Sequence, residues 1–129
     1  FRTDRQASII ADFGDGKMLT FLISTQLSGN QSGELLGTRG RVEIVVPFNA
    51  LPMASSALLV DKGETMDGSL ARREIIPPCD QYTEQAEDFA QAVFGGPALA
   101  WGVDDAVASM KVLDAIFASG KSGGWAEIR

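Results

Sequence analysis

The residues best suited to chemistry stand together at Asp80-Gln81-Tyr82, three side chains that can each donate or accept hydrogen bonds. The spacing of the apolar residues that follow predicts a helix starting here. The free backbone N–H groups of a helix N-terminus favour an anionic or hydroxylated ligand. We therefore take Asp80, Gln81 and Tyr82 as candidate substrate-binding residues. In the structural alternative, Asp80 caps the helix and Tyr82 packs with its hydroxyl bonded to a neighbour.

The sequence positions of the other polar groups favour structural roles for them. Asp104-Asp105 stands where a second helix is predicted to start, and adjacent acids there are typical of capping. Arg41 and Glu43 are expected to form a surface pair across strands. Gly14-Asp15-Gly16-Lys17 lacks the spacing of a phosphate-binding loop and is predicted to be a hairpin turn. None of these groups points to a catalytic centre.

Cysteine and histidine usage excludes several enzyme classes. The single cysteine, Cys79, excludes an internal disulfide and a zinc site of the usual kind. The sequence contains no histidine, which removes the commonest general base and the commonest metal ligand. A self-contained hydrolase of the Ser-His or Cys-His type is therefore excluded. We predict no catalytic, cofactor-binding or metal-binding residue within these 129 residues.

Length and charge indicate a single domain, residues 1–129, of ordinary size. A net charge of −6 argues against a nucleic-acid-binding surface, which needs clustered Lys and Arg. The longest apolar run, Met18 to Ile23, is interrupted by Thr20 and is far shorter than the roughly 20 residues of a membrane span. No signal-peptide pattern is present, so we expect a cytoplasmic protein that binds no membrane. The first residue is Phe1, so we expect a processed chain or a part of a longer one.

The first half of the chain alternates with period 2 and predicts about six strands. In the hairpin predicted around residues 14–16, Leu19, Phe21 and Ile23 share one face, while Met18 and Leu22 make the other face apolar as well. We therefore expect both faces to be at least partly covered. Short links favour an open-faced, mainly antiparallel sheet. The predicted strands are 7–13, 17–27, 33–37, 41–46, 57–60 and 70–76.

The second half changes to helical spacing. Asp80 is the predicted N-cap of a helix whose apolar stripe runs from Tyr82 to Val93, and Gly95-Gly96-Pro97 is predicted to end it. A second helix is predicted from Asp104-Asp105 to Gly120. The tail Trp125 to Ile128 is short enough to be a last edge strand. Together these elements predict an α+β fold in which two C-terminal helices follow the sheet.

Four pieces of the chain, in this order, carry a resemblance to a known family. The sequence resembles the C-terminal domain of the glucose-fructose oxidoreductase, inositol dehydrogenase and MocA (Gfo/Idh/MocA) family of oxidoreductases, and it is most similar to the sugar and dihydrodiol dehydrogenase-like members. The pieces are the strand and acidic turn 7–16, Gly37-Thr38-Arg39-Gly40-Arg41-Val42-Glu43-Ile44 with Pro47-Phe48, Asp80-Gln81-Tyr82 leading into Glu87-Asp88-Phe89, and 104–117 with Ser122-Gly123-Gly124-Trp125.

This resemblance implies an N-terminal Rossmann domain, bound NAD or NADP, and a sugar, polyol or similar substrate between the two domains. It also implies a homodimer formed through the sheet face. The glycine-rich nucleotide loop and the Glu-Lys-Pro motif of the family do not occur in these residues. We therefore expect this chain to be the last part of such an enzyme, contributing a substrate-pocket wall and a subunit interface. Alone, it is expected to bind no cofactor and to be inactive.

Two other functions are compatible with the sequence. A stand-alone module could bind a small ligand or a protein on its open sheet face. A purely structural dimerisation domain would associate without binding a ligand.

Overall fold

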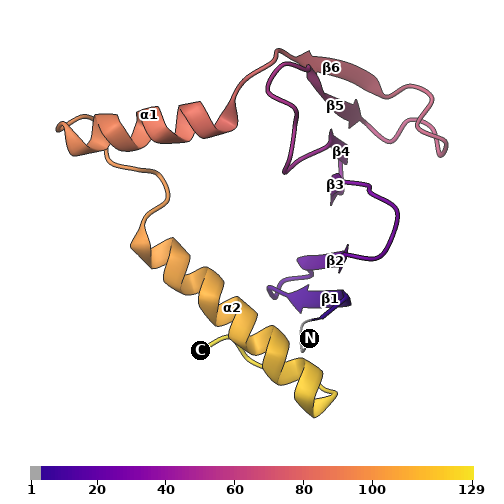
Figure 1. Cartoon of the computed structure of the whole chain (residues 1–129). Helices are drawn as coiled ribbons and strands as arrows, with labels where there is room; N and C mark the ends of the chain where they lie inside the picture. Colours follow the sequence, from indigo (N-terminus) through magenta and orange to yellow (C-terminus); the bar gives the residue numbers. More distant parts are fainter. Residues whose placement is uncertain (1–3) are drawn as a thin grey trace. The chain divides into compact units, whose positions relative to one another are not determined.

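The computed structural model describes residues 4–129 and contains six strands followed by two helices (Figure 1). All strand pairs are antiparallel, so the α+β class and the antiparallel pairing are confirmed. The strands are β1 Gln6–Asp12, β2 Met18–Ser24, β3 Ser32–Gly37, β4 Gly40–Val45, β5 Ser56–Asp61 and β6 Arg72–Ile76. The helices are α1 Gln81–Val93 and α2 Val103–Ser122.

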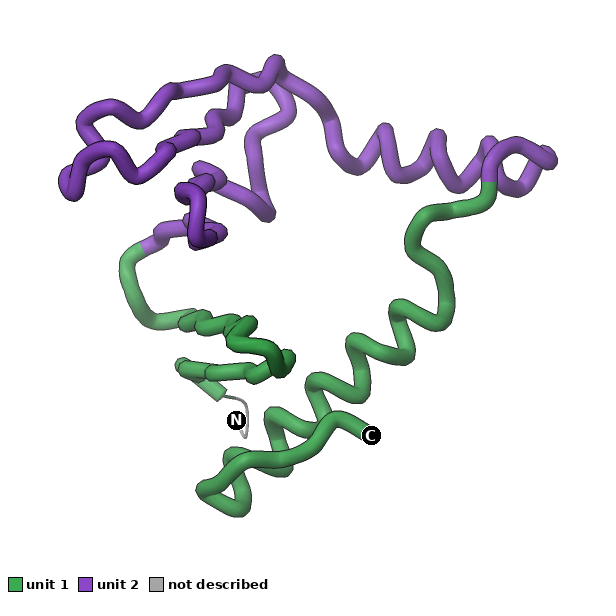
Figure 2. The backbone as a smooth tube through the Cα atoms, turned by 180° about the vertical axis from the view of Figure 1, so that it is seen from behind, with its two compact units in different colours: residues 1–28, 98–129 green, residues 29–97 purple. Residues whose placement is uncertain are grey.

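The strands are divided between two sheets, β1-β2 and β3-β4-β5-β6. The chain turns after β2 because the Ser24 hydroxyl oxygen accepts hydrogen bonds from the amides of Gln26 and Leu27, at 3.0 and 3.3 Å. The chain forms two compact units, one from the stretch up to residue 28 together with 98–129, the other from 29–97 (Figure 2). The β1-β2 hairpin and α2 belong to the first unit, and the four-stranded sheet and α1 belong to the second.

The β1-β2 hairpin has one wholly apolar face. Its tight turn is confirmed, with Gly14, Asp15 and Gly16 at φ values of 76°, 51° and 73°. The Asp12 side chain supports this turn by accepting a hydrogen bond from the Gly14 amide at 2.8 Å. The register pairs the residues of the apolar face as Ala7 with Ile23, Ile9 with Phe21, and Ala11 with Leu19. The opposite face mixes polar residues with the exposed side chains of Ile10, Met18 and Leu22.

The four-stranded sheet also has two unlike faces. Alternation and register place an apolar row on one face: Leu35, Val42, Ile44, Leu58 and Val60. The other face carries Glu34, Arg41 and Asp61 next to one another. Beyond β4, Val46 adopts φ 55°, a left-handed conformation that is unusual for a β-branched residue, and Pro47 follows it.

Complete burial is rare in the described residues. Ala57 and Asp61, both on β5, are the two buried residues within 4–129, at 2% and 5% exposure. Both lie on the same face of the four-stranded sheet because they are separated by an even number of positions. The centre of this sheet is therefore the best-packed region that the structure describes.

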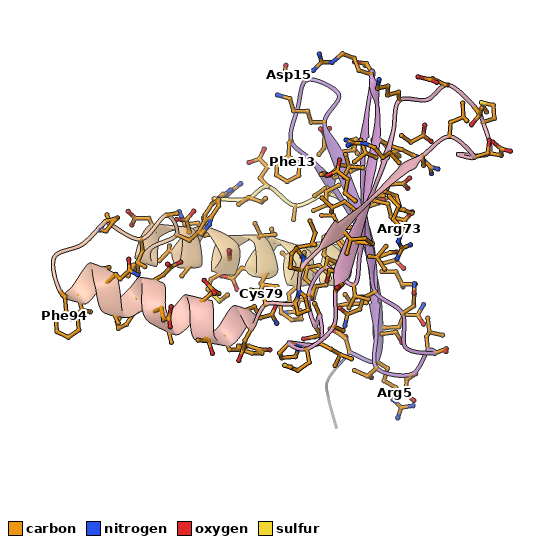
Figure 3. All side chains as sticks on the ribbon, turned by 90° about the horizontal axis from the view of Figure 1, so that it is seen from above. Arg5, Phe13, Asp15, Arg73, Cys79 and Phe94 are labelled. Carbon is orange, nitrogen blue, oxygen red and sulfur yellow. The ribbon has the colours of Figure 1, made fainter. Side chains whose placement is uncertain are left out.

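Helix α1 begins and ends where the sequence predicts. Asp80 is its N-cap, and its side chain accepts a hydrogen bond from the Tyr82 amide. After Phe94 at the C-cap, Gly95 adopts φ 84°, and the Gly96 amide donates to the Gln91 carbonyl at 2.9 Å. In Figure 3 the Phe94 side chain projects from this end of the helix, opposite the end near Cys79.

Helix α2 differs from the prediction at its C-terminal end. The helix continues through Gly120 and ends at Ser122, where Gly123 takes the left-handed C-cap conformation at φ 70°. Gly120 has no positive φ, so nothing in its backbone ends the helix.

The predicted edge strand at Trp125–Ile128 is wrong. The tail forms no strand and instead turns back, with the Ser119 hydroxyl donating to the Gly124 carbonyl at 2.7 Å. Neither α1 nor α2 is long and apolar enough to cross a membrane.

Candidate functional site

Asp80 is occupied with helix capping. Its Oδ1 accepts a hydrogen bond from the Tyr82 amide at 3.1 Å, and its Oδ2 accepts one from the Thr83 hydroxyl at 3.0 Å. The Thr83 hydroxyl and then the Tyr82 amide lower the pKa of Asp80, because both bonds favour the charged carboxylate. Both oxygens of Asp80 therefore already have partners within the first turn of α1, as the capping interpretation requires.

Gln81 links α1 to a distant part of the sheet unit. Its Nε2 donates a hydrogen bond to the backbone carbonyl of Phe48 at 3.2 Å, across 33 positions of sequence. Phe48 lies in the connection between β4 and β5, so this bond holds that connection beside the start of α1. One of the two amide donors of Gln81 is thus engaged in the fold.

Tyr82 has the most available polar group of the three candidates. Tyr82 is 64% exposed, and its hydroxyl bonds to no residue in the described range 4–129. The structure thus brings Asp80, Gln81 and Tyr82 together at the start of α1 and assigns fold contacts to the first two. A ligand at this place would meet the Tyr82 hydroxyl and the exposed ring below it.

The remaining groups noted in the sequence are structural or isolated. Asp105 Oδ2 accepts a hydrogen bond from the Gly102 amide at 3.1 Å, so it caps the start of α2 as expected. Cys79 is an exposed free thiol on the segment that leads into α1 (Figure 3). No group of three or more acidic, Cys or His side chains within residues 4–129 could hold a metal ion.

The best-built polar cluster lies on the four-stranded sheet. Arg41 donates from Nε to Asp61 Oδ2 at 3.1 Å and from Nη1 to Glu34 Oε1 at 3.0 Å. These hydrogen bonds raise the pKa of Arg41, the bond to Glu34 contributing most. The expected pairing of Arg41 with Glu43 does not form, because the register places Asp61 directly opposite Arg41.

Sequence reasoning missed the role of Asp61. The signal was present: Asp61 continues the alternation of Ala57 and Leu59, so an acid stands on a face of β5 that is otherwise apolar. A buried acid needs a hydrogen-bonding or charged partner. The alternation of β4, the neighbouring strand, allows Arg41 to lie on the same face of the sheet. The register that joins the two residues could not be derived from the residues alone.

Comparisons with known proteins point to oxidoreductases. Over 125 residues, the chain is 34% identical to an uncharacterized oxidoreductase of Rhizobium meliloti and 27% identical to a D-xylose 1-dehydrogenase (NADP(+)) of Haloferax volcanii. Each match covers 97% of this chain and 37% of the relative, so the chain spans little more than a third of the length of these relatives. No family model and no solved structure matches. The chain is thus similar to a part of longer oxidoreductases.

Proposed function

We propose that this chain is the C-terminal, substrate-facing part of an NAD(P)-dependent oxidoreductase of the Gfo/Idh/MocA type that acts on a hydroxyl or carbonyl group of a sugar or polyol. The observation that carries the proposal is the similarity to two oxidoreductases over almost the whole chain, but over only 37% of each relative. The name of the Haloferax volcanii relative favours an aldose such as D-xylose as substrate and NADP as cofactor.

In this proposal, the chemistry belongs to the part of the enzyme that carries the nucleotide. The 129 residues contain no glycine-rich dinucleotide fingerprint and no histidine. Their contribution is binding, since positioning a substrate hydroxyl against a nicotinamide lowers the entropic barrier of hydride transfer. Tyr82 is the residue we assign to the pocket wall, because its hydroxyl is free to bond to a substrate hydroxyl. Asp80 and Gln81 hold the helix start and the adjoining connection in place.

The test begins with the coding sequence that precedes Phe1. We expect a G-x-G-x-x-G motif followed by Glu-Lys-Pro, and a start codon directly upstream of Phe1 would contradict the proposal. The protein encoded by the longer reading frame is expected to reduce NADP⁺ or NAD⁺ with an aldose, whereas the 129 residues alone are expected to show no turnover. Turnover by the 129 residues alone would overturn the assignment of chemistry to the preceding part.

The role of Tyr82 is tested in that longer protein. Tyr82→Phe is expected to lower kcat/KM about fivefold, the equivalent of about 1 kcal/mol for one hydrogen bond, mainly through KM. Thr83→Val is the matched control, because Thr83 bonds to Asp80 and would affect only the helix cap. Equal effects of the two substitutions would indicate that Tyr82 acts through the helix and not through the substrate.

We further propose that the mixed face of the β1-β2 hairpin contacts a second copy of the protein. On this face Ile10, Met18 and Leu22 are each more than half exposed, although the opposite face is already wholly apolar. Leu22→Asp is expected to convert a dimer into a monomer in light scattering, because it places a charge in an apolar contact. Leu27→Asp, at a similarly exposed leucine beyond the strand, is the control and is expected to leave the dimer intact. A monomeric wild-type protein at high concentration would refute this part of the proposal.

A further inference from the structure

The turn between β3 and β4 borders an open hollow of about 480 Å³, far from the start of α1 in sequence. Apolar side chains of the sheet form its floor: Leu35, Val42 and Val60. Thr38 and Arg39 of the turn and Lys62, directly after β5, also line it. We call this set of three apolar and three polar residues the β3-β4 corner. Leu36 and the paired side chains of Arg41 and Asp61 line the hollow as well. The corner itself therefore combines an apolar surface with two further cations, Arg39 and Lys62.

The corner is held in shape by close backbone packing. Gly40 adopts φ 142°, and a Cβ at this position would overlap the carbonyl oxygen of Asp61 and lie 3.1 Å from Cα of Lys62. The turn and the end of β5 are therefore in direct contact. Asp61 strengthens this contact, because its Oδ2 accepts from Arg41 and its Oδ1 from the Gly63 amide at 2.8 Å. The residues on either side of the hollow thus have little freedom to move apart.

Within residues 4–129, the two cations of the corner have no carboxylate partner. Arg41, the neighbouring cation, is already paired with both Glu34 and Asp61. Arg39 and Lys62 are both exposed, and neither forms an ion pair with any residue of the range 4–129. The net charge of the chain is −6. Two unpaired cations beside one apolar floor nevertheless give this surface a locally positive potential.

We propose that the β3-β4 corner binds an amphiphilic organic anion, a molecule with a carboxylate or phosphate group on an apolar body. The anionic group lies between Arg39 and Lys62, within reach of the Thr38 hydroxyl, and the apolar body covers Leu35, Val42 and Val60. Arg guanidinium groups and Lys ammonium groups form charge-assisted hydrogen bonds with such anions. The floor contributes through burial of the exposed Leu35 and of the half-buried Val42 and Val60. This site is separate from the pocket wall assigned to Tyr82 and does not depend on the proposed dehydrogenase activity.

The proposal is tested by titrating the ¹⁵N-labelled protein with hexanoate at low ionic strength. Acetate, which has the charge without the body, and 1-hexanol, which has the body without the charge, are titrated in parallel. We expect hexanoate to shift the amides of 35–42 and 60–63 in a saturable manner, with acetate and hexanol each at least about tenfold weaker. An absence of shifts, shifts spread over α1 and α2, or an equal response to hexanol would overturn the proposal.

Charge-neutralising variants identify the binding groups. The double variant Arg39→Gln with Lys62→Gln is expected to weaken hexanoate binding by about tenfold or more, because both ionic contacts are lost. Lys111→Gln, an exposed lysine in the middle of α2, is the matched control and is expected to bind hexanoate as the wild type does. Should the double variant lose its dispersed spectrum, the two single variants replace it, and each is expected to weaken binding by a smaller factor. Unchanged binding in the folded variants would refute the assignment of Arg39 and Lys62.

Discussion

Nε of Arg41 lies 3.1 Å from Oδ2 of Asp61, whose side chain is only 4% exposed, and the two residues are directly opposite each other on β4 and β5. The second carboxylate oxygen of Asp61, Oδ1, accepts a hydrogen bond from the Gly63 amide at 2.8 Å. The carboxylate therefore joins two strands and also holds the first residues of the loop 62–71. A buried carboxylate is tolerated in a fold when its oxygens are paired in this way.

Removing this carboxylate should loosen the loop after β5. We expect Asp61→Ala to cost about 2 kcal/mol, the value of hydrogen bonds to a charged group, and to speed amide exchange at Gly63 and along 62–71. Asp67→Ala is the control, because Asp67 is exposed and bonds within its own turn to the Ser69 amide at 3.0 Å. Its effect should stay local to residues 65–69. Unchanged exchange at Gly63 in the Asp61 variant would contradict the role given to this pair.

Gly40 should be intolerant of any side chain. Gly40→Ala adds a Cβ that overlaps the Asp61 carbonyl oxygen, at a φ of 142° that L-residues rarely adopt, and we expect a loss of about 1–3 kcal/mol. The measurement is chemical denaturation followed by the fluorescence or NMR signals of the sheet. Gly29→Ala serves as the matched substitution, since Gly29 has no positive φ and a Cβ added there would meet open space. We expect that substitution to be nearly neutral.

Val46 is a site where a smaller residue should stabilise the fold. It occupies the left-handed region at φ 55°, which costs an L-residue roughly 1–2 kcal/mol. Val46→Gly should remove that cost, and the added chain entropy of glycine should offset about half of the gain. The free energy of unfolding is therefore expected to rise by up to about 1 kcal/mol. The same substitution at Val45, within β4, is expected to lower it, and a lower value for the Val46 variant would contradict the strained geometry.

The start of α1 should depend on pH through Asp80. The pKa of Asp80 is below its ordinary value of 3.8 in the folded chain, so its cap stabilises α1 above that pH and loses this contribution as the pH falls through the lowered pKa. Acid titration should thus speed exchange of the Tyr82, Thr83 and Glu84 amides below pH 3.8. Asp80→Asn caps without titrating and should abolish this pH dependence. The same acid response in the Asn variant would show that another group is responsible.

The elements themselves can be predicted because their signals are local. The Gly14-Asp15-Gly16 turn depends on backbone conformations that glycine permits, and the Asp80 cap depends on groups two and three positions away. The sequence predicts that α2 ends at Gly120, but a glycine ends a helix only where the chain takes the left-handed conformation. That conformation occurs at Gly123. Whether Gly120 or Gly123 ends the helix depends on how the tail turns back to bond with Ser119. Neither glycine shows this by itself.

The sequence by itself therefore determined the antiparallel strands, the tight turn after β1, the two helices and the capping role of Asp80. Each of these follows from residues within a few positions of one another, whose conformational preferences act before any packing. Only the tertiary structure decided that Arg41 pairs with Asp61, that Gln81 bonds to the Phe48 carbonyl, and that Arg39 and Lys62 flank one hollow. These relationships involve residues at least 20 positions apart, and they exist only once strand register has brought distant backbone segments together.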